Sequence, residues 1–120
     1  MQKSRPTHST EINGKRYIWF TERLWKLAQG LPEFDLEVES LQELDRDCWF
    51  GAGSTPTIRA VATHCKRINE VDSKFPIIIN ANGRLMDGGH RLARAWLAGH
   101  KTIKAVQFVE MPEPDQIKDL

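Results

Sequence analysis

The sequence of 120 residues lacks the marks of several protein classes. It has two cysteines, Cys48 and Cys65, and neither belongs to a CxxC pair or to a Cys/His spacing typical of zinc ligands, so we expect reduced thiols in the interior. No apolar run approaches the roughly 20 residues that span a bilayer, and residues 1–15 lack the apolar core of a signal peptide. These absences favour a cytoplasmic protein without a membrane partner.

An excess of charge of one sign is also missing. Lys and Arg number 17 against 16 Asp and Glu, and the formal net charge of +1 gives no overall signature of nucleic-acid binding. Seven acidic residues and one arginine lie between residues 33 and 47, where they would repel a DNA backbone. Contact with DNA would therefore need another face, such as the basic N-terminal arm.

The residues that are present suit one small domain. Hydrophobic residues make up 40% of the chain, and four tryptophans and five phenylalanines can fill a core of this size, which excludes disorder, collagen and a coiled coil for the chain as a whole. We expect a mobile N-terminal arm over residues 1–15, a domain over residues 16–110 and an acidic, proline-containing tail over residues 111–120.

Strand and helix patterns alternate within the expected domain. Strand patterns occupy residues 17–20, 34–39, 75–79, 84–86 and 102–109, and helical patterns occupy residues 22–28, 56–68 and 90–98. Thr55 followed by Pro56 fits the start of the second helix. The predicted fold class is α/β (α+β), a small mixed β-sheet with packed helices.

The second helix has an apolar face, which we expect in the core because its residues recur at helical spacing. The residues of this face are Ile58, Val61, Ala62, Cys65 and Ile68. Arg59, His64 and Arg67 lie off that face, where they could extend a basic pocket or meet solvent.

The most informative segment is residues 86–94, in which a strand leads through Asp87, Gly88 and Gly89 into a helix with basic groups. The first turn of a helix leaves backbone N–H groups unpaired at the positive end of its dipole, so this arrangement suits an anion. The glycines would permit close approach or unusual dihedrals, and we expect Gly89 to carry this requirement. An ordinary turn in which Asp87 caps the helix would explain the same residues.

Side chains of this helix could complete a phosphate site. Arg91 can form a bidentate fork on a phosphate group, and Arg94 lies one turn further along the same side. His90 could donate to a phosphate oxygen or move a proton. Asp87 could instead bind the magnesium ion that accompanies nucleotides.

Residues 75–108 resemble the ParB/sulfiredoxin superfamily through the motifs Pro-Ile-Ile-Ile, Asn-Gly-Arg-Leu-Met, Asp-Gly-Gly-His-Arg and Ala-Trp-Leu-Ala-Gly-His. The resemblance implies a ParB/sulfiredoxin-like fold whose Asp-Gly-x-His-Arg turn, here Gly88, Gly89, His90 and Arg91, holds nucleotide phosphates. It also implies a nucleoside triphosphate or diphosphate, such as ATP or CTP, with Mg²⁺. Sulfiredoxins have their reactive cysteine where this chain has Gly89, so sulfinic acid reduction is not expected.

Known members of the superfamily are CTP-binding partition proteins, ATP-using sulfiredoxins and a kinase of free serine. The likeness to the kinase implies a catalytic acid before the central helix, where the candidates are Asp45, which we prefer, Glu43 and Asp47. A solvated acidic turn is the plain alternative. Trp49 follows in a glycine-rich loop, where it could stack on a nucleobase or cover the site.

The expected function is therefore nucleotide binding through the phosphates, with phosphoryl transfer or nucleotide hydrolysis as a further activity. His90 joins Glu43 and Asp45 as a catalytic candidate. The alternatives are a nucleotide-switched module that acts with a DNA-binding or protein partner, and a nuclease of the ParB-like kind. The helix-turn-helix domain of the partition proteins has no counterpart in this sequence, so we do not expect specific DNA binding by these residues alone.

Overall fold

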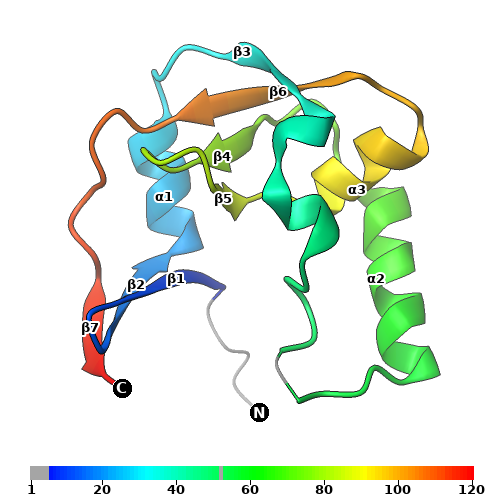
Figure 1. Cartoon of the computed structure of the whole chain (residues 1–120). Coiled ribbons are helices and arrows are strands. Elements are labelled where there is room, and N and C mark those ends of the chain that lie inside the picture. The colour runs from blue at the N-terminus through cyan, green and yellow to red at the C-terminus, as the bar shows by residue number, and fades with distance from the viewer. Residues whose placement is uncertain (1–5, 52) are drawn as a thin grey trace.

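The computed structural model describes residues 6–51 and 53–120, which form two β-sheets and three α-helices (Figure 1). The strands are β1 (Thr7–Ile12), β2 (Lys15–Phe20), β3 (Phe34–Glu37), β4 (Ile77–Ile79), β5 (Leu85–Asp87), β6 (Thr102–Gln107) and β7 (Gln116–Asp119). The helices are α1 (Thr21–Ala28), α2 (Ile58–Glu70) and α3 (Gly89–Leu97), with short 3-10 helices η1 (Val38–Ser40) and η2 (Gln42–Asp45). The predicted α/β (α+β) class is confirmed. No helix of the described segments is long and apolar enough to cross a membrane.

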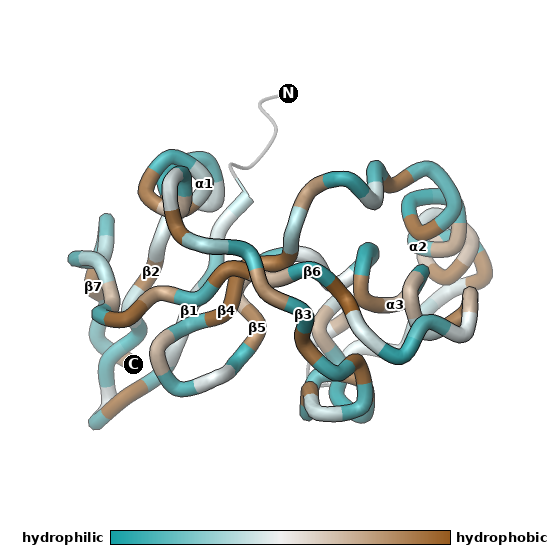
Figure 2. Tube along the Cα trace, turned by 90° about the horizontal axis from the view of Figure 1, so that it is seen from above, coloured by the Kyte–Doolittle hydropathy of each residue, from teal (hydrophilic) through white to brown (hydrophobic). Residues whose placement is uncertain are grey.

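The larger sheet has the strand order β3-β6-β4-β5, and it is mixed because β4 and β6 are parallel while the other neighbours are antiparallel. Its middle strand, β4, is fully buried, and its side chains point alternately to the two faces of the sheet. Ile77 and Ile79 pack in the cluster that contains Leu92 of α3, whereas Ile78 packs in the cluster that contains Leu24 of α1. Seen from above, the hydrophobic segments of β4 and β6 lie between α1 and α3 (Figure 2). This packing fixes the start of α3 beside the end of β5.

The expected mobile arm is wrong for the residues that the structure describes, and the end of the expected tail forms a strand. β1 and β7 are the outer strands of a second, antiparallel sheet with the order β1-β2-β7. A turn at Asn13 and Gly14, both with positive φ, joins β1 to β2. Asp115 ties the tail to β2, since its Oδ2 accepts a hydrogen bond from the backbone N–H of Phe20 at 2.8 Å. Residues 1–5 of the expected arm lie outside the described residues.

The interpretation of α2 is wrong in two respects. Its cap is Thr57, whose side chain accepts a hydrogen bond from a backbone N–H of the first turn, and not Thr55. Its apolar face is exposed: of the five residues expected in the core only Ile68 is buried, and Ile58 is 92% exposed. The helix contacts α3 through the side that carries His64 and Ile68, so only the edge of the expected apolar face is used.

Candidate functional site

A cleft with a volume of about 640 Å³ lies between β1, the segment that follows η2, the end of β5 and the start of α3. In Figure 1, β1 and the segment that leads from η2 towards α2 lie on opposite sides of the space below β5. The cleft brings together predicted site residues from distant parts of the sequence and adds basic residues that the sequence analysis did not select. The predicted residues in its lining are Glu43, Asp47, Trp49, Asp87, Gly88, Gly89 and His90, and the additional basic ones are His8, Arg46 and Arg84.

The start of α3 forms one wall of this cleft. Gly88 is the N-cap residue, with φ of 111° and ψ of 25°, and its position has no side-chain cap from any described residue. The amide of Leu92 donates to the Gly88 carbonyl at 2.9 Å, so the N–H groups before it have no acceptor within the helix. Such a helix start can bind an anion.

The backbone requires glycine at Gly88. The φ of Gly88 is in the left-handed region, and a Cβ there would lie 2.5 Å from Cγ2 of the fully buried Ile77. Gly89 has no left-handed φ, and a Cβ there would lie 3.3 Å from Nε1 of Trp49. The unusual dihedral expected at Gly89 is therefore wrong, because the chain turns into the helix one residue earlier, while close approach of a phosphate to Gly89 stays a prediction.

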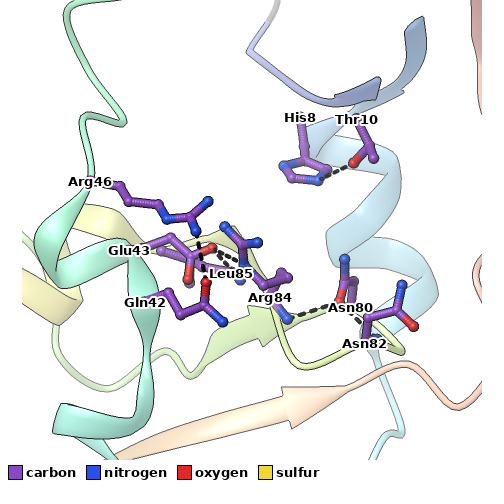
Figure 3. A network of polar contacts seen from close by, with 9 residues as sticks. All are labelled: His8, Thr10, Gln42, Glu43, Arg46, Asn80, Asn82, Arg84 and Leu85. Atoms are coloured by element: carbon purple, nitrogen blue, oxygen red, sulfur yellow. Dashed lines mark hydrogen bonds and ion pairs between the residues drawn. The ribbon is translucent and has the colours of Figure 1, made fainter. Parts of the chain in front are cut away.

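Glu43 is the buried carboxylate of the cleft, with a side chain that is 8% exposed. Its Oε2 accepts hydrogen bonds from Nε of Arg84 at 2.9 Å and from the backbone N–H of Leu85 at 3.2 Å (Figure 3). Its Oε1 is buried and has no hydrogen-bond partner among the described residues. One oxygen is thus held in place while the other can accept a hydrogen bond or a proton from a ligand.

His8 comes to the cleft from β1, so the segment expected to be a mobile arm supplies part of the wall. Thr10 Oγ1 and His8 Nε2 lie 3.4 Å apart (Figure 3). The His8 ring lies 5.9 Å from that of Trp19. Burial lowers the pKa of His8, and the negative charges of Glu43 and Asp87 oppose that effect. His8 is therefore a site residue that the sequence analysis missed.

Trp49, His64 and His90 form an aromatic stack beside the start of α3. Nδ1 of His64 and Nε2 of His90 lie 2.8 Å apart, a hydrogen-bond distance. The Trp49 indole is stacked on both imidazoles, with centroid distances of 4.6 Å to His64 and 4.8 Å to His90 and interplanar angles of 10° and 6°. Burial lowers the pKa of both histidines; Arg67 adds to this for His64, and His64 and then Arg67 add to it for His90. These shifts favour a neutral pair at neutral pH.

Asp47 shapes the loop that carries Trp49. Its Oδ1 accepts hydrogen bonds from the backbone N–H groups of Phe50 at 2.8 Å and of Trp49 at 2.9 Å. These bonds stabilise the carboxylate and lower the pKa of Asp47. Although Asp47 lines the cleft, its carboxylate is engaged in the turn, so its role is to position Trp49.

Arg91 lies on a different side of α3 and does not line the cleft. Its guanidinium lies over the rings of Trp25 and Phe75, 5.1 Å and 5.9 Å from their centroids, and its Nη1 is 3.8 Å from Oδ2 of Asp87. The same oxygen of Asp87 accepts a hydrogen bond from Nε1 of Trp25 at 2.8 Å. Arg91 therefore ties α3 to α1, and the expected fork on a phosphate in the cleft is not supported by its position.

Five other candidates also lie outside the cleft lining, and one of them, His64, contacts the lining through His90 and Trp49. Arg94 donates through Nη1 to the last carbonyls of α2, so it caps that helix. Arg59 and Arg67 are exposed on α2, although Arg67 acts electrostatically on the histidine pair. Asp45, our preferred catalytic candidate, is exposed because a 3-10 turn has three residues per turn and directs it away from the side that Glu43 occupies.

Both cysteines are exposed, which corrects the expectation of interior thiols. Cys65 belongs to the exposed apolar face of α2, and Cys48 belongs to the loop that carries Trp49. Partial burial and the charges of Glu43 and Asp47 raise the pKa of the Cys48 thiol, which keeps it protonated and poorly nucleophilic. In residues 6–51 and 53–120, no group of three or more His, Cys, Asp or Glu side chains could hold a metal ion.

Comparison of the chain with protein-family models, with curated proteins and with solved structures finds no match in any of the three.

Proposed function

We propose that the cleft binds a nucleotide through its phosphate groups at the start of α3. The proposal is carried by the uncapped first turn of α3, whose residues Gly88, Gly89 and His90 line the cleft. Unpaired N–H groups and the positive end of the helix dipole together favour an anion at this position. Because Gly88 and Gly89 have no side chains, a phosphate oxygen can approach the backbone closely.

The basic residues of the lining support a phosphate ligand. Arg46 follows η2, Arg84 precedes β5 and His8 belongs to β1, so positive or protonatable groups come from three parts of the chain. Arg46 is held by Gln42, whose Oε1 accepts a hydrogen bond from Nη2 at 2.9 Å. The resemblance of residues 75–108 to the ParB/sulfiredoxin superfamily, which rests partly on this same turn, implies nucleotide phosphates at this position.

The carboxylates of the cleft do not fit a dedicated magnesium site. Asp87, the residue that we expected as a ligand, has Oδ2 engaged by Trp25 and close to the cation of Arg91. Asp47 is engaged by backbone N–H groups. We therefore treat Mg²⁺ as a counter-ion of the nucleotide, and we assign it no protein ligand.

Phosphoryl transfer is a second candidate activity, and Glu43 is the residue that favours it. The acceptor hydroxyl in such a reaction needs a group that orients it and takes its proton. Oε1 of Glu43 is buried, lacks a partner among the described residues and belongs to a side chain in the lining. Glu43 thus replaces Asp45 as the proposed catalytic residue.

Isothermal titration calorimetry with ATP, ADP, CTP, GTP and pyrophosphate, with and without Mg²⁺, tests the binding proposal. His90→Phe keeps an aromatic ring for Trp49 to stack on but removes both ring nitrogens, so binding should weaken roughly tenfold or more. His100→Phe is the matched control, because His100 is exposed and outside the cleft. Absence of binding by the unaltered protein, or equal binding by both variants, would reject the proposal.

Turnover separates an enzyme from a binding module. The assay follows nucleotide consumption with small hydroxyl acceptors, free serine first, and with water alone. Glu43→Gln should keep nucleotide affinity and abolish consumption, since the amide retains the shape of the side chain and loses its basicity. If the unaltered protein binds a nucleotide without consuming it, the binding module that acts with a partner is favoured instead.

A further inference from the structure

The hydrogen bond between the rings of His64 and His90 restricts the chemistry that His90 can perform in the cleft. Nε2 of His90 is 2.8 Å from Nδ1 of His64, so that nitrogen is already engaged. The remaining nitrogen, Nδ1 of His90, is the one available to a ligand. A neutral imidazole has one N–H and one bare nitrogen, so the direction of the bond between the rings decides whether Nδ1 is a donor or an acceptor.

Only one direction is compatible with a phosphate. If His90 donated through Nε2, its Nδ1 would be bare and would repel a phosphate oxygen, which only accepts hydrogen bonds. If His64 donates through Nδ1, then Nε2 of His90 is the acceptor and Nδ1 of His90 carries the hydrogen. In that tautomer the second N–H of His90, a residue of the cleft lining, can donate to an anion at the start of its own helix.

The surroundings of His90 favour its neutral form. Burial has the largest effect and lowers the pKa of His90, the charges of His64, Arg67 and Arg91 lower it further, and Asp87, the last residue of β5, opposes them. His90 is therefore an imidazole with one N–H, as both directions of the bond require.

From this geometry we infer that His64 is a positioning residue, which holds His90 in the tautomer that donates from Nδ1 to a bound phosphate. The inference rests on the proposed function. Trp49 keeps the pair aligned, since its indole is stacked on both rings within 10° of parallel. Phe50 contacts His64 edge-on at a centroid distance of 5.3 Å and also limits its rotation.

Nitrogen-15 NMR of the imidazoles tests the tautomer without any ligand. In the unaltered protein at neutral pH, His90 should have its hydrogen on Nδ1, the tautomer that is the minor one for a free neutral imidazole. His64→Phe keeps the stacked ring but removes the donor, so His90 should change to the Nε2–H form. His64→Asn has an amide N–H near the position of Nδ1 and should restore the Nδ1–H form. A hydrogen on Nε2 of His90 in the unaltered protein would overturn the inference.

Titration of the same three proteins with ADP and pyrophosphate tests the consequence for binding. His64→Phe should weaken binding roughly tenfold, because His90 then loses the tautomer whose Nδ1–H donates to the charged phosphate. His64→Asn should recover most of the affinity. If the unaltered protein and His64→Phe bind equally well, His64 has no positioning role, although the proposed function stands. If the unaltered protein binds neither ligand nor any other nucleotide, the proposed function fails. The role of His64 towards phosphate then fails too, even if His90 is found in the Nδ1–H form.

Discussion

Replacing Gly88 with alanine should destabilise the protein more than the same change at Gly83 or Gly99. All three glycines have left-handed backbones, with φ of 111°, 83° and 76°. An L-residue in this conformation costs about 1 to 2 kcal/mol. A Cβ at Gly83 or Gly99 would have no described atom within 4 Å, so these two positions measure the backbone cost alone.

Gly88 has a second cost, which comes from its contact with β4. A Cβ there would lie 2.5 Å from Cγ2 and 3.0 Å from Cβ of Ile77, a residue with 0% exposure in the middle of the larger sheet. Adding a carbon to a packed core costs about 1 to 3 kcal/mol. The expected loss in the free energy of unfolding is therefore about 2 to 5 kcal/mol for Gly88→Ala, against about 1 to 2 kcal/mol for the two controls.

Urea unfolding of the three variants, followed by tryptophan fluorescence and far-ultraviolet circular dichroism, measures these losses as shifts of the midpoint at constant m value. A loss at Gly88 that exceeds both controls would support the close contact between the start of α3 and β4. Equal losses at all three positions would refute it and would leave the left-handed φ as the reason for a glycine at Gly88.

Three further predictions use the same measurement. Arg91→Ala should lower the free energy of unfolding by about 1 to 3 kcal/mol, because the contacts of the guanidinium with Trp25, Phe75 and Asp87 are lost. The control Arg59→Ala should change little, since Arg59 is exposed. Equal stabilities of the two variants would contradict the link between α3 and α1. Glu43→Ala should lower the free energy of unfolding by about 1 to 3 kcal/mol, since it removes the acceptor of the Leu85 N–H and of Arg84. The control Asp35→Ala breaks an exposed ion pair with Lys104 and should have no measurable effect. The pKa values of His8, His64 and His90 are lowered from the ordinary 6.5, so the unfolded chain binds protons more readily than the folded protein. The free energy of unfolding should therefore fall as the pH drops below about 6.5 towards the lowered pKa values. Unfolding measured from pH 8 to pH 5 should show a smaller fall for His64→Phe, and an identical fall would mean that His64 is not responsible for part of it.

Local patterns in the sequence were enough to predict the larger sheet and the helix of the glycine turn. The isoleucine run gave β4, the Asn82-Gly83 pair gave the turn to β5, and the helical period after Gly89 gave α3. Each of these elements depends on residues that are neighbours in the chain, which is why composition and spacing record them. The glycine turn before α3 was also visible in this way, because its glycines and its helix start are contiguous.

One local signal was present but not used. Asn13 and Gly14 form the same hairpin pair as Asn82 and Gly83, and the structure has a two-residue turn there. The strand before it, β1, was assigned to the arm because its side chains are mostly polar and exposed, so it lacks an apolar alternation. His8 was missed for this reason.

Tertiary structure alone decided which side chains meet in the cleft. The rotation of α2 about its axis exposes Ile58 and turns His64 towards His90, 26 residues away, although the apolar face of the helix predicted the opposite. Likewise, the packing of α1 on the sheet holds the Arg91 guanidinium over Trp25 and beside Asp87, outside the lining of the cleft. A sequence pattern records which residues share a face of one helix or strand. Which face packs against the rest of the protein depends on the shape of the neighbouring elements, and that shape exists only after the sheets and helices have packed together.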